Sequence, residues 1–286
     1  MTSVANPSAP IHKARATQVA VVQHCAGTDV AANMASLTQS SRQAREQGAE
    51  LICWPEAFAY LGSHRGKKAI LEPLPEGGPI LAQCQELAKE LDADLLLGGF
   101  HEACATDPER CYNTSVYLSR DGQVQATYRK IHLFDVNIVD GPQLMESRQT
   151  LPGESVTTVS TPCGVLGLSV CYDVRFPALY QALIKAGAIA ITVPSAFTAK
   201  TGAMHWHALL RARAIECQCY VIAPAQHGRH SEHRASYGHS LIVDPWGEII
   251  AELPQGDGYA MATVDPDLVA QVRQELPSLA NQRDFA

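Results

Sequence analysis

The sequence predicts a mixed α/β fold, and three of its features lead to that expectation. Short runs of β-branched and aliphatic residues alternate with longer helical stretches over most of the 286 residues. Some neighbouring apolar runs flank tight-turn sequences, which indicates antiparallel hairpins among the alternating strands and helices. No segment rich in proline, glycine and serine divides the chain. We therefore expect one α/β domain with mixed sheets inside and helices outside.

The first half of the chain begins with a β-branched run and a helix that Asp29 can cap. An Asp-Gly turn sequence at 119–122 predicts a hairpin later in this half. The inner face of the first helix is expected to carry Ala32, Leu37, Ser41 and Ala44. The expected elements are strands at 18–23, 50–54 and 94–100, helices at 29–47 and 78–91, and a hairpin of 114–118 with 124–128.

The second half is centred on an apolar run at 165–170, which predicts a buried strand of about six residues. The run ends on Cys171, and Pro177 follows at a point where the first turn of a helix accepts proline. The other expected elements are a helix from there to Gly187, strands at 188–193, 220–225 and 259–264, a helix at 204–218, and a hairpin of 241–244 with 248–253.

Composition and charge exclude several classes of function. The net charge is -7 and no run of lysine or arginine occurs, which argues against a nucleic-acid-binding surface. No apolar stretch approaches the ~20 residues that span a bilayer, so we expect no membrane segment. The nine cysteines are odd in number and scattered, without a Cys-x-x-Cys pair. They favour reduced thiols in a cytoplasmic protein over a disulfide framework.

Both ends of the chain are expected to lie outside the folded domain. Residues 1–16 are rich in alanine, serine and proline but lack the apolar core of a secretory signal. We expect a disordered leader there, with an organellar transit peptide as the alternative. The expected boundaries are a leader at 1–16, the domain at 17–275 and a C-terminal tail at 276–286.

Cys171 is a candidate nucleophile because it stands where the central strand gives way to a helix. A strand-to-helix elbow lifts one side chain and the next backbone N–H out of the edge of a sheet. Such a turn supplies both the attacking atom and a donor for an oxyanion. The alternative is that Cys171 packs as a small buried apolar residue, as free cysteines often do.

Glu56 and Lys130 share the context of Cys171, since each follows an apolar strand. A thiol needs a base, and a glutamate within hydrogen-bond reach supplies one. A lysine beside them can stabilise the oxyanion together with the backbone N–H of Tyr172. Taken singly, Glu56 is also typical of a helix start and Lys130 of a charged surface. Together the residues predict a catalytic set.

Three segments of the chain resemble the signature segments of the nitrilase superfamily of carbon–nitrogen hydrolases. They are Trp54-Pro55-Glu56, Tyr128 to Leu133 (YRKIHL) and Cys171 to Pro177 (CYDVRFP). The resemblance covers residues 18–273 in the family's order. It implies a four-layer α-β-β-α sandwich, a homodimer or larger oligomer, and a Cys-Glu-Lys triad that needs no cofactor.

The same resemblance implies a second glutamate between the lysine and the cysteine, and it falls on Glu146. This carboxylate would hold Lys130 in place and keep it charged. Without the resemblance, Glu146 would be a typical solvated loop residue.

Further segments are similar to the subgroup of this family that hydrolyses deaminated glutathione: residues 194–197, 205–206, 210–216, 226–230 and 234–240. The resemblance implies a small-molecule amide carrying a carboxylate as the substrate. The related ω-amidases, which act on 2-oxoglutaramate and 2-oxosuccinamate, are the alternative, and they usually have glycine where this chain has Ser195. A nitrilase-like binding protein without catalysis is a third hypothesis, which predicts a missing triad member. Departures from the family pattern at Ala178, Ala203 and His207 leave the triad untouched.

Arg175 is the candidate for binding a substrate carboxylate, because the start of the next helix can aim it into the pocket. A structural ion pair is the alternative role for Arg175. Phe197 and Thr198, just after the strand that ends at Pro194, can wall the pocket and offer a hydroxyl to the substrate.

His227, His230 and His233 recur on one short segment and raise the question of a metal site. Arg229 and Arg234 stand among them and would repel a cation. The sequence therefore favours a polar loop near the active site or a dimer interface, and we expect no metal.

Overall fold

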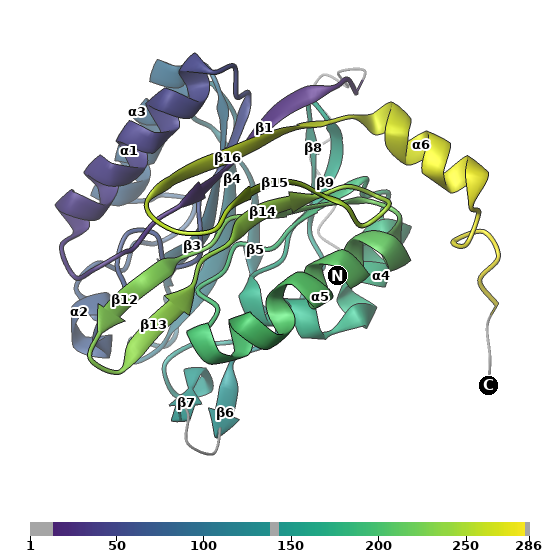
Figure 1. Cartoon of the computed structure of the whole chain (residues 1–286). Coiled ribbons are helices and arrows are strands. Elements are labelled where there is room, and N and C mark those ends of the chain that lie inside the picture. The colour runs from purple at the N-terminus through teal and green to yellow at the C-terminus, as the bar shows by residue number, and fades with distance from the viewer. Residues whose placement is uncertain (1–13, 138–142, 284–286) are drawn as a thin grey trace.

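The computed structural model describes residues 14–137 and 143–283, and two six-stranded sheets form its centre (Figure 1). Residues 1–13 of the expected leader lie outside the described residues. In order across the first sheet, the strands are β16 (Gly258–Val264), β1 (Thr17–Gln23), β2 (Leu51–Cys53), β3 (Asp94–Ala103), β4 (Cys111–Leu118) and β5 (Val124–Arg129). Across the second they are β15 (Ile249–Leu253), β14 (Ser240–Val243), β11 (Tyr220–Ala223), β10 (Ala190–Thr192), β9 (Gly164–Gly167) and β8 (Thr158–Thr161).

Each large sheet is built around three parallel strands. In the first sheet these are β1, β2 and β3, and in the second they are β9, β10 and β11. The remaining strands pair antiparallel, and β5 runs in the same direction as β3 because two antiparallel steps separate them. The segments that follow β2, β5, β9, β10 and β11 therefore leave from the carboxyl ends of parallel strands. Ligand sites commonly form beyond such ends.

Helices cover the outer face of each sheet, so the layer order is α-β-β-α (Figure 1). The first sheet is covered by α1 (Val30–Glu46) and α3 (Pro79–Leu91), the second by α4 (Pro177–Lys185) and α5 (Ala199–Cys217). Short elements are α2 (His64–Lys68), the 3₁₀ helices Glu146–Arg148 and Cys171–Arg175, and the hairpins β6 (Asp135–Asn137) with β7 (Gln143–Met145) and β12 (His227–Ser231) with β13 (Arg234–Tyr237). The last helix, α6 (Pro266–Glu275), lies at the margin of the body (Figure 1) and buries Val269 and Val272 against it.

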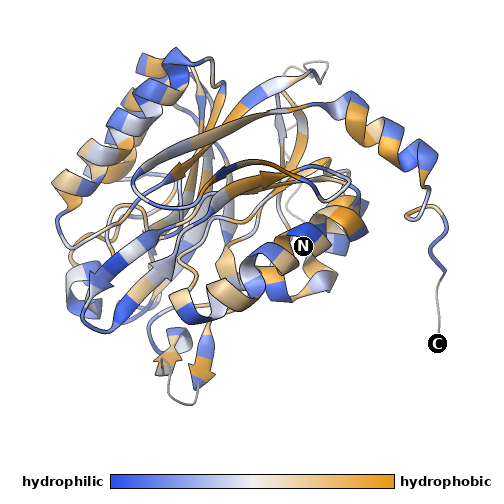
Figure 2. Cartoon of the chain, viewed as in Figure 1, coloured by the Kyte–Doolittle hydropathy of each residue, from blue (hydrophilic) through white to orange (hydrophobic). Residues whose placement is uncertain are grey.

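The alternation of side chains along β1 shows how the layers are held together. Val19 and Val21 belong to the core between the two sheets, whereas Ala20 and Val22 belong to the core beneath α1 and α3. A strand that is buried on both faces reads as a continuous apolar run, which is what the sequence shows here. Figure 2 shows the same arrangement, with apolar strands inside and helices that are apolar on one side.

Several local features agree with the sequence and others correct it. Asp29 caps α1, since its Oδ1 accepts a hydrogen bond from the Ala32 N–H at 3.0 Å, but Ala32 itself is exposed and not on the inner face. The strand expected at 165–170 ends at Gly167, and α5 begins at Ala199 instead of 204. The segment with His227 and His230, expected as a polar loop, forms the hairpin β12–β13.

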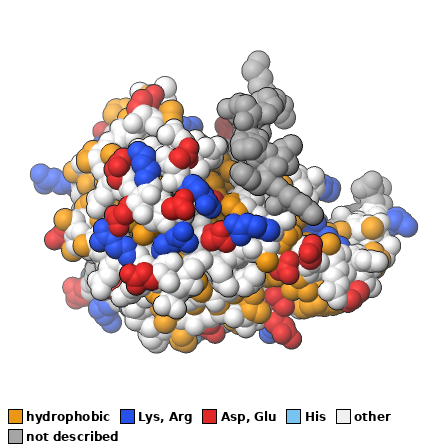
Figure 3. Space-filling model, turned by 90° about the horizontal axis from the view of Figure 1, so that it is seen from above, with side chains coloured by type: hydrophobic (Ala, Val, Ile, Leu, Met, Phe, Trp, Pro, Cys, Tyr) orange, Lys and Arg blue, Asp and Glu red, His pale blue; other side chains and the backbone are white. Residues whose placement is uncertain are grey.

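The surface features are those of a chain with mixed charge. On the face seen in Figure 3, acidic and basic side chains are interspersed and no single sign gathers. No helix among the described residues is both long and apolar enough to cross a bilayer. All nine cysteines are unpaired.

Gly98 and Gly99 allow the two sheets to approach each other at the carboxyl end of β3. A Cβ atom on Gly98 would lie 2.1 Å from the Trp54 carbonyl oxygen and 2.3 Å from the Pro194 side chain. A Cβ atom on Gly99 would lie 2.9 Å from the Cα of Glu56. The β3–β4 register shifts at this point, as expected for a bulge next to a close approach. Glycine is therefore required where the segments after β2 and β10 meet.

We expect Gly98→Ala to lower the free energy of unfolding by about 1–3 kcal/mol, because the added methyl group meets backbone that cannot move aside. The urea midpoint measures this change. Gly27→Ala is the matched control, since a Cβ there has nothing within 4 Å. Equal midpoints for the two variants would contradict the close approach.

Candidate active site

The predicted catalytic residues come together at the carboxyl edge of both sheets. Glu56 follows β2, Lys130 follows β5, and Cys171 follows β9 after a short extended segment. Their side chains are all buried, and they line one pocket of about 450 Å³. A volume in this range is typical of sites for small molecules.

Glu56 is a buried carboxylate, and both of its oxygens accept hydrogen bonds. Its Oε1 accepts hydrogen bonds from Lys130 Nζ at 3.0 Å and Asn113 Nδ2 at 2.8 Å, and its Oε2 accepts one from the Ala196 N–H at 2.8 Å. Burial raises the pKa of Glu56, but the Lys130 charge and hydrogen bonds, including one from Cys171, outweigh burial and lower it to about 2. Glu56 is therefore ionised at neutral pH and ready to accept a proton.

Lys130 lies between two carboxylates. Its Nζ donates to Glu56 as above and to Glu146 Oε2 at 2.8 Å. Burial lowers the pKa of Lys130, and the charges of Glu146, Glu56 and Cys171 together raise it well above its usual value. The ammonium is thus held charged. Glu146 is itself fixed by the backbone N–H of Phe134, which donates to its Oε2 at 2.7 Å. The structure therefore brings Glu146 to the position that the resemblance implied.

Cys171 stands at a strained turn beside Glu56. Its φ is 50°, a left-handed conformation that is uncommon outside glycine and is often found at functional sites. Its N–H donates to the Pro194 carbonyl at 2.9 Å. Burial and then the Glu56 charge raise the pKa of the Cys171 thiol, and the thiol hydrogen-bonds to that carboxylate. The resting state is therefore a neutral thiol next to an ionised base.

Asp173 builds the elbow that carries Cys171, a role that the sequence did not suggest. It is fully buried, and its Oδ2 accepts hydrogen bonds from the Tyr128 hydroxyl at 2.8 Å and the Val170 N–H at 2.9 Å. Its Oδ1 accepts from the His132 N–H at 3.0 Å and lies 2.7 Å from the His132 Nδ1. One carboxylate thus joins the segment after β5 to the turn at Cys171.

Gln226 fixes the backbone of Glu56 in a similar way. Its side-chain amide donates to the Glu56 carbonyl at 3.0 Å and accepts from the Ala26 N–H at 2.8 Å. Gln226 is fully buried and its own N–H donates to the Ser195 carbonyl at 2.8 Å. The first residue of the Gln-His-Gly-Arg-His stretch therefore supports the base.

Asn113 is another functional residue that the sequence did not indicate. Its Nδ2 donates to Glu56 at 2.8 Å and to Glu146 Oε1 at 3.3 Å, so one amide bridges both carboxylates. Its Oδ1 is buried and has no hydrogen-bond partner among the described residues. The available signal was an asparagine directly before the strand predicted at 114–118, since asparagine is depleted in strands.

The predicted pocket residues take different places. Tyr172, Phe197 and Thr198 line the pocket, and the Tyr172 ring packs edge-on against Phe134 with centroids 4.9 Å apart. Tyr172 directly follows Cys171, where its N–H is the expected oxyanion donor. That role stays a prediction.

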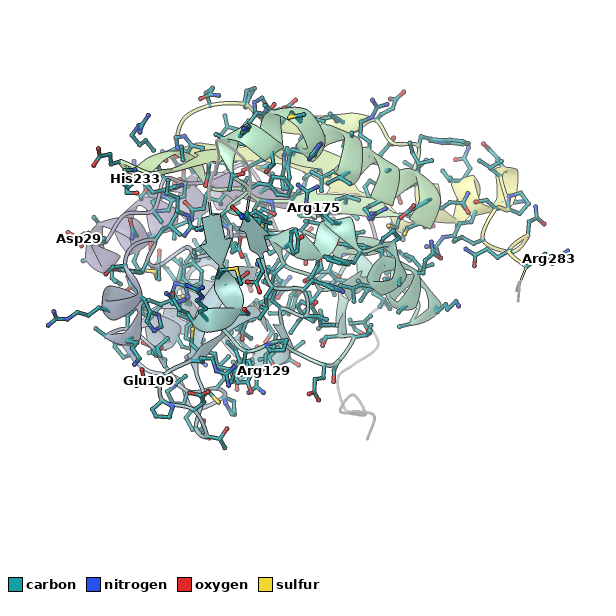
Figure 4. The ribbon with its side chains drawn as sticks, turned by 90° about the horizontal axis from the view of Figure 1, so that it is seen from below. Asp29, Glu109, Arg129, Arg175, His233 and Arg283 are labelled. Carbon is teal, nitrogen blue, oxygen red and sulfur yellow. The ribbon has the colours of Figure 1, made fainter. Side chains whose placement is uncertain are left out.

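Arg175 is not among the residues that line the pocket. Its guanidinium nitrogens lie 3.3 Å from His205 Nδ1, and its Cζ lies 5.1 Å from the centroid of the Phe197 ring. Figure 4 labels Arg175, and it also labels His233 at the turn between β12 and β13. Arg175 therefore stands behind one pocket wall, and its contact with a substrate carboxylate stays a prediction.

The three imidazoles that raised the question of a metal make other contacts. His230 contacts the Ala26 carbonyl and the Ser236 hydroxyl, and His227 contacts Asp257. His233 is exposed at the hairpin turn. A separate group, His207, His239 and Glu252, brings its ligating atoms within 4.8 Å of one another. Both imidazoles there lie within hydrogen-bond distance of the same Glu252 oxygen, at 2.9 and 2.6 Å, which accounts for the grouping.

Comparison with known proteins agrees with this geometry. The model of the carbon-nitrogen hydrolase family matches residues 18–274. The chain is 46% identical over 269 residues to the human protein named deaminated glutathione amidase, a match that covers 93% of this chain and 82% of the human protein.

Solved structures show the same fold. The Caenorhabditis elegans NitFhit protein matches with a TM-score of 0.89 and 37% identity, covering 94% of this chain, which spans 66% of that longer chain. Saccharomyces cerevisiae Nit3, described as a member of branch 10 of the nitrilase superfamily, matches with a TM-score of 0.86 and 32% identity, covering 97% and 99% of the two chains. The predicted resemblance and the predicted α-β-β-α sandwich are confirmed.

We expect Asn113→Ala to lower kcat/KM at pH 7 about 10-fold or more, because it removes the charge-assisted hydrogen bond, worth about 1.5–3 kcal/mol, that holds the carboxylate of Glu56 in position. The ionised form of Glu56 loses stabilisation, so its pKa rises from about 2. The acidic limb of the pH profile should then begin about one to two pH units higher. Profiles of kcat/KM against pH measure both effects.

The control for this variant is Asn281→Ala, which changes an exposed asparagine near the C-terminus. It should leave the profile unaltered. An Asn113→Ala enzyme with the wild-type profile would show that the amide does not act on the base.

Proposed function

The chain belongs to the carbon–nitrogen hydrolase family, and we propose that it hydrolyses the amide bond of deaminated glutathione through a thioester on Cys171. The observation that carries this proposal is the hydrogen-bonded row of Cys171, Glu56 and Lys130, all of which line one pocket. Each member is present, which disfavours a binding protein without catalysis. The relative named deaminated glutathione amidase supports the choice of substrate.

The first half of the reaction transfers the acyl group to sulfur. Glu56 takes the thiol proton as Cys171 attacks the amide carbonyl carbon. Lys130 Nζ and the Tyr172 N–H hold the oxyanion that forms. Glu56 then gives its proton to the leaving nitrogen, the C–N bond breaks, and the amine departs.

The second half releases the acid. A water molecule occupies the space that the amine left, and Glu56 takes a proton from it as its oxygen attacks the thioester carbonyl. The same two donors hold the second oxyanion. The C–S bond breaks, the thiolate recovers a proton from Glu56, and the enzyme returns to its thiol–carboxylate resting state.

The charges of the pocket support an anionic substrate. Besides Lys130, the side chains of Lys67, Arg148 and Arg234 line it. Deaminated glutathione carries one carboxylate on its 2-oxo acyl part and a second on its dipeptide part. A neutral nitrile has no carboxylate for these cations to bind, and 2-oxoglutaramate has only the carboxylate of the 2-oxo acyl part.

The test is a product assay of kcat/KM on deaminated glutathione, 2-oxoglutaramate, an N-carbamoyl amino acid and a neutral aliphatic nitrile. We expect deaminated glutathione to lead the neutral nitrile by at least about 10- to 100-fold, the value of one charge-assisted contact. Arg175→Lys should narrow that lead if Arg175 engages the acyl carboxylate bidentately. A lead for the nitrile would refute the substrate assignment.

The same assay tests the thioester. Cys171→Ala should abolish turnover, and mass spectrometry of the wild type with a slow amide should show an acyl adduct on Cys171. Cys104→Ala, which removes a thiol outside the pocket lining, is the matched control and should keep full activity. Turnover in Cys171→Ala at the wild-type rate would exclude the mechanism.

We also propose that the chain forms a homodimer through the outer face of α5. Met204 and Ile215 on this helix are 69% and 50% exposed, and Trp246 in the β14–β15 turn is 45% exposed. A Cβ on Gly247 would meet Ile215, so the turn and the helix form one surface. Exposed apolar residues that gather in this way are typical of protein interfaces.

Ile215→Arg should shift a dimer toward monomer in sedimentation velocity, because it buries a charge in the interface. Val156→Arg is the control, since Val156 is also exposed, at 44%, but lies on the loop before β8. A wild-type chain that sediments only as a monomer at micromolar concentration would refute the dimer.

A further inference from the structure

The pocket contains cations that the chemistry does not use. Lys67 lies on α2 and Arg234 lies on β13, and both line the pocket without belonging to the catalytic row. Among the described residues, no carboxylate lies within ion-pair distance of either side chain, whereas the pocket carboxylates Glu56 and Glu146 are both engaged by Lys130. Two cations without a carboxylate partner in one pocket favour an anionic ligand.

Both cations act on the same pocket residue, His101. Its Nε2 lies 3.0 Å from the Tyr60 carbonyl oxygen, to which it donates. Burial, followed by the charges of Lys67 and Arg234, lowers the pKa of His101 to about 4. The imidazole is therefore neutral at pH 7, and Lys67 and Arg234 are the positively charged groups that act on it.

This end of the pocket lies on the side of Glu56. Glu56 pairs with Gly99, two residues before His101 on β3, and the Glu56 charge also acts on His101. Four residues that follow Glu56 in the chain line the pocket on the way to α2, namely Ala57, Tyr60, Leu61 and Gly62. Because Glu56 gives its proton to the leaving nitrogen, the amine part of the substrate must extend from this side.

The hairpin β12–β13 holds Arg234 in place. His230 Nδ1 lies 2.9 Å from the Ala26 carbonyl and its Nε2 lies 2.8 Å from the Ser236 hydroxyl. The pKa of His230 is lowered to about 4, mainly by burial. The ring is therefore neutral, and it donates to the carbonyl and accepts from the hydroxyl. Ser236 bridges to Thr198 and the Tyr237 N–H donates to the Phe197 carbonyl at 2.9 Å. The hairpin is thus fixed to the pocket wall.

We propose that Lys67 and Arg234 bind the carboxylate at the far end of the substrate's amine part. This inference rests on the proposed function, in which the amine part is a dipeptide that ends in a carboxylate. Arg234 offers a planar fork to that carboxylate and Lys67 offers a point charge. The two residues select amides with an anionic leaving group over amides that release ammonia.

The test compares three substrates in Lys67→Gln and Arg234→Gln. They are deaminated glutathione, the same compound with its glycine carboxylate converted to an amide, and 2-oxoglutaramate. On the first, each variant should lose about 10- to 100-fold in kcat/KM, mainly through KM. On the other two, which lack the distal carboxylate, the variants should stay within about 3-fold of wild type. Wild type should itself lose a similar factor when the carboxylate is amidated.

Two matched controls stand beside the tested residues. Lys68 neighbours Lys67 but pairs with Glu109 at 2.8 Å, and Arg229 lies on β12 with its side chain exposed. Lys68→Gln and Arg229→Gln should leave all three substrates unaffected, and Lys67→Arg, which keeps the charge, should retain most of the activity.

The outcomes separate this inference from the proposed function. Equal losses on all three substrates would give Lys67 and Arg234 a structural role and overturn the subsite, as would wild-type kinetics on deaminated glutathione. A wild-type enzyme that hydrolyses 2-oxoglutaramate but not deaminated glutathione would overturn the proposed substrate, and the subsite with it. Melting temperatures of the variants show whether each one folds.

Discussion

The buried ammonium of Lys130 is the constraint on which the rest of the site depends. A charge removed from water is costly unless it is paired, and here two carboxylates satisfy the group. Removing either carboxylate would leave an uncompensated charge in the interior. The ends of β2 and β5 and the segment after β7 must therefore converge on one point. The arrangement of the site follows from this pairing, because each oxygen of Glu56 and Glu146 accepts a hydrogen bond from a specific donor.

The architecture makes that convergence available. Three strands of each sheet run parallel, so their carboxyl ends meet at one edge when the sheets stack. Gly98 removes the side chain that would keep Trp54 and Pro194 apart. The backbone N–H of Ala196 can then donate to Glu56. Ala196, at the edge of the second sheet, thus orients the base that follows a strand of the first sheet. The two halves of the chain thus share one catalytic group.

The sequence indicated the catalytic residues because each occurs where an apolar run gives way to polar residues. Residues that act through long-range hydrogen bonds left no such pattern. Asn113, Asp173 and Gln226 are far in sequence from the groups they orient, and local periodicity does not report such contacts. The hairpin β12–β13 was also missed as an element, since its polar strands lack the apolar alternation typical of a half-buried sheet. Its pairing depends on contacts to Ala26 and Thr198, which belong to distant segments.

The excess of negative charge in the catalytic row has a consequence for the end of the reaction. With a neutral thiol, Glu56 and Glu146 outnumber the single ammonium of Lys130. The amide enters with an uncharged reacting centre and meets no repulsion there. Hydrolysis turns that centre into a carboxylic acid. When the acid loses its proton to water it becomes a third carboxylate, which the first two repel at short range. The arrangement that activates the thiol therefore also drives out the acid it produces and disfavours the reverse reaction.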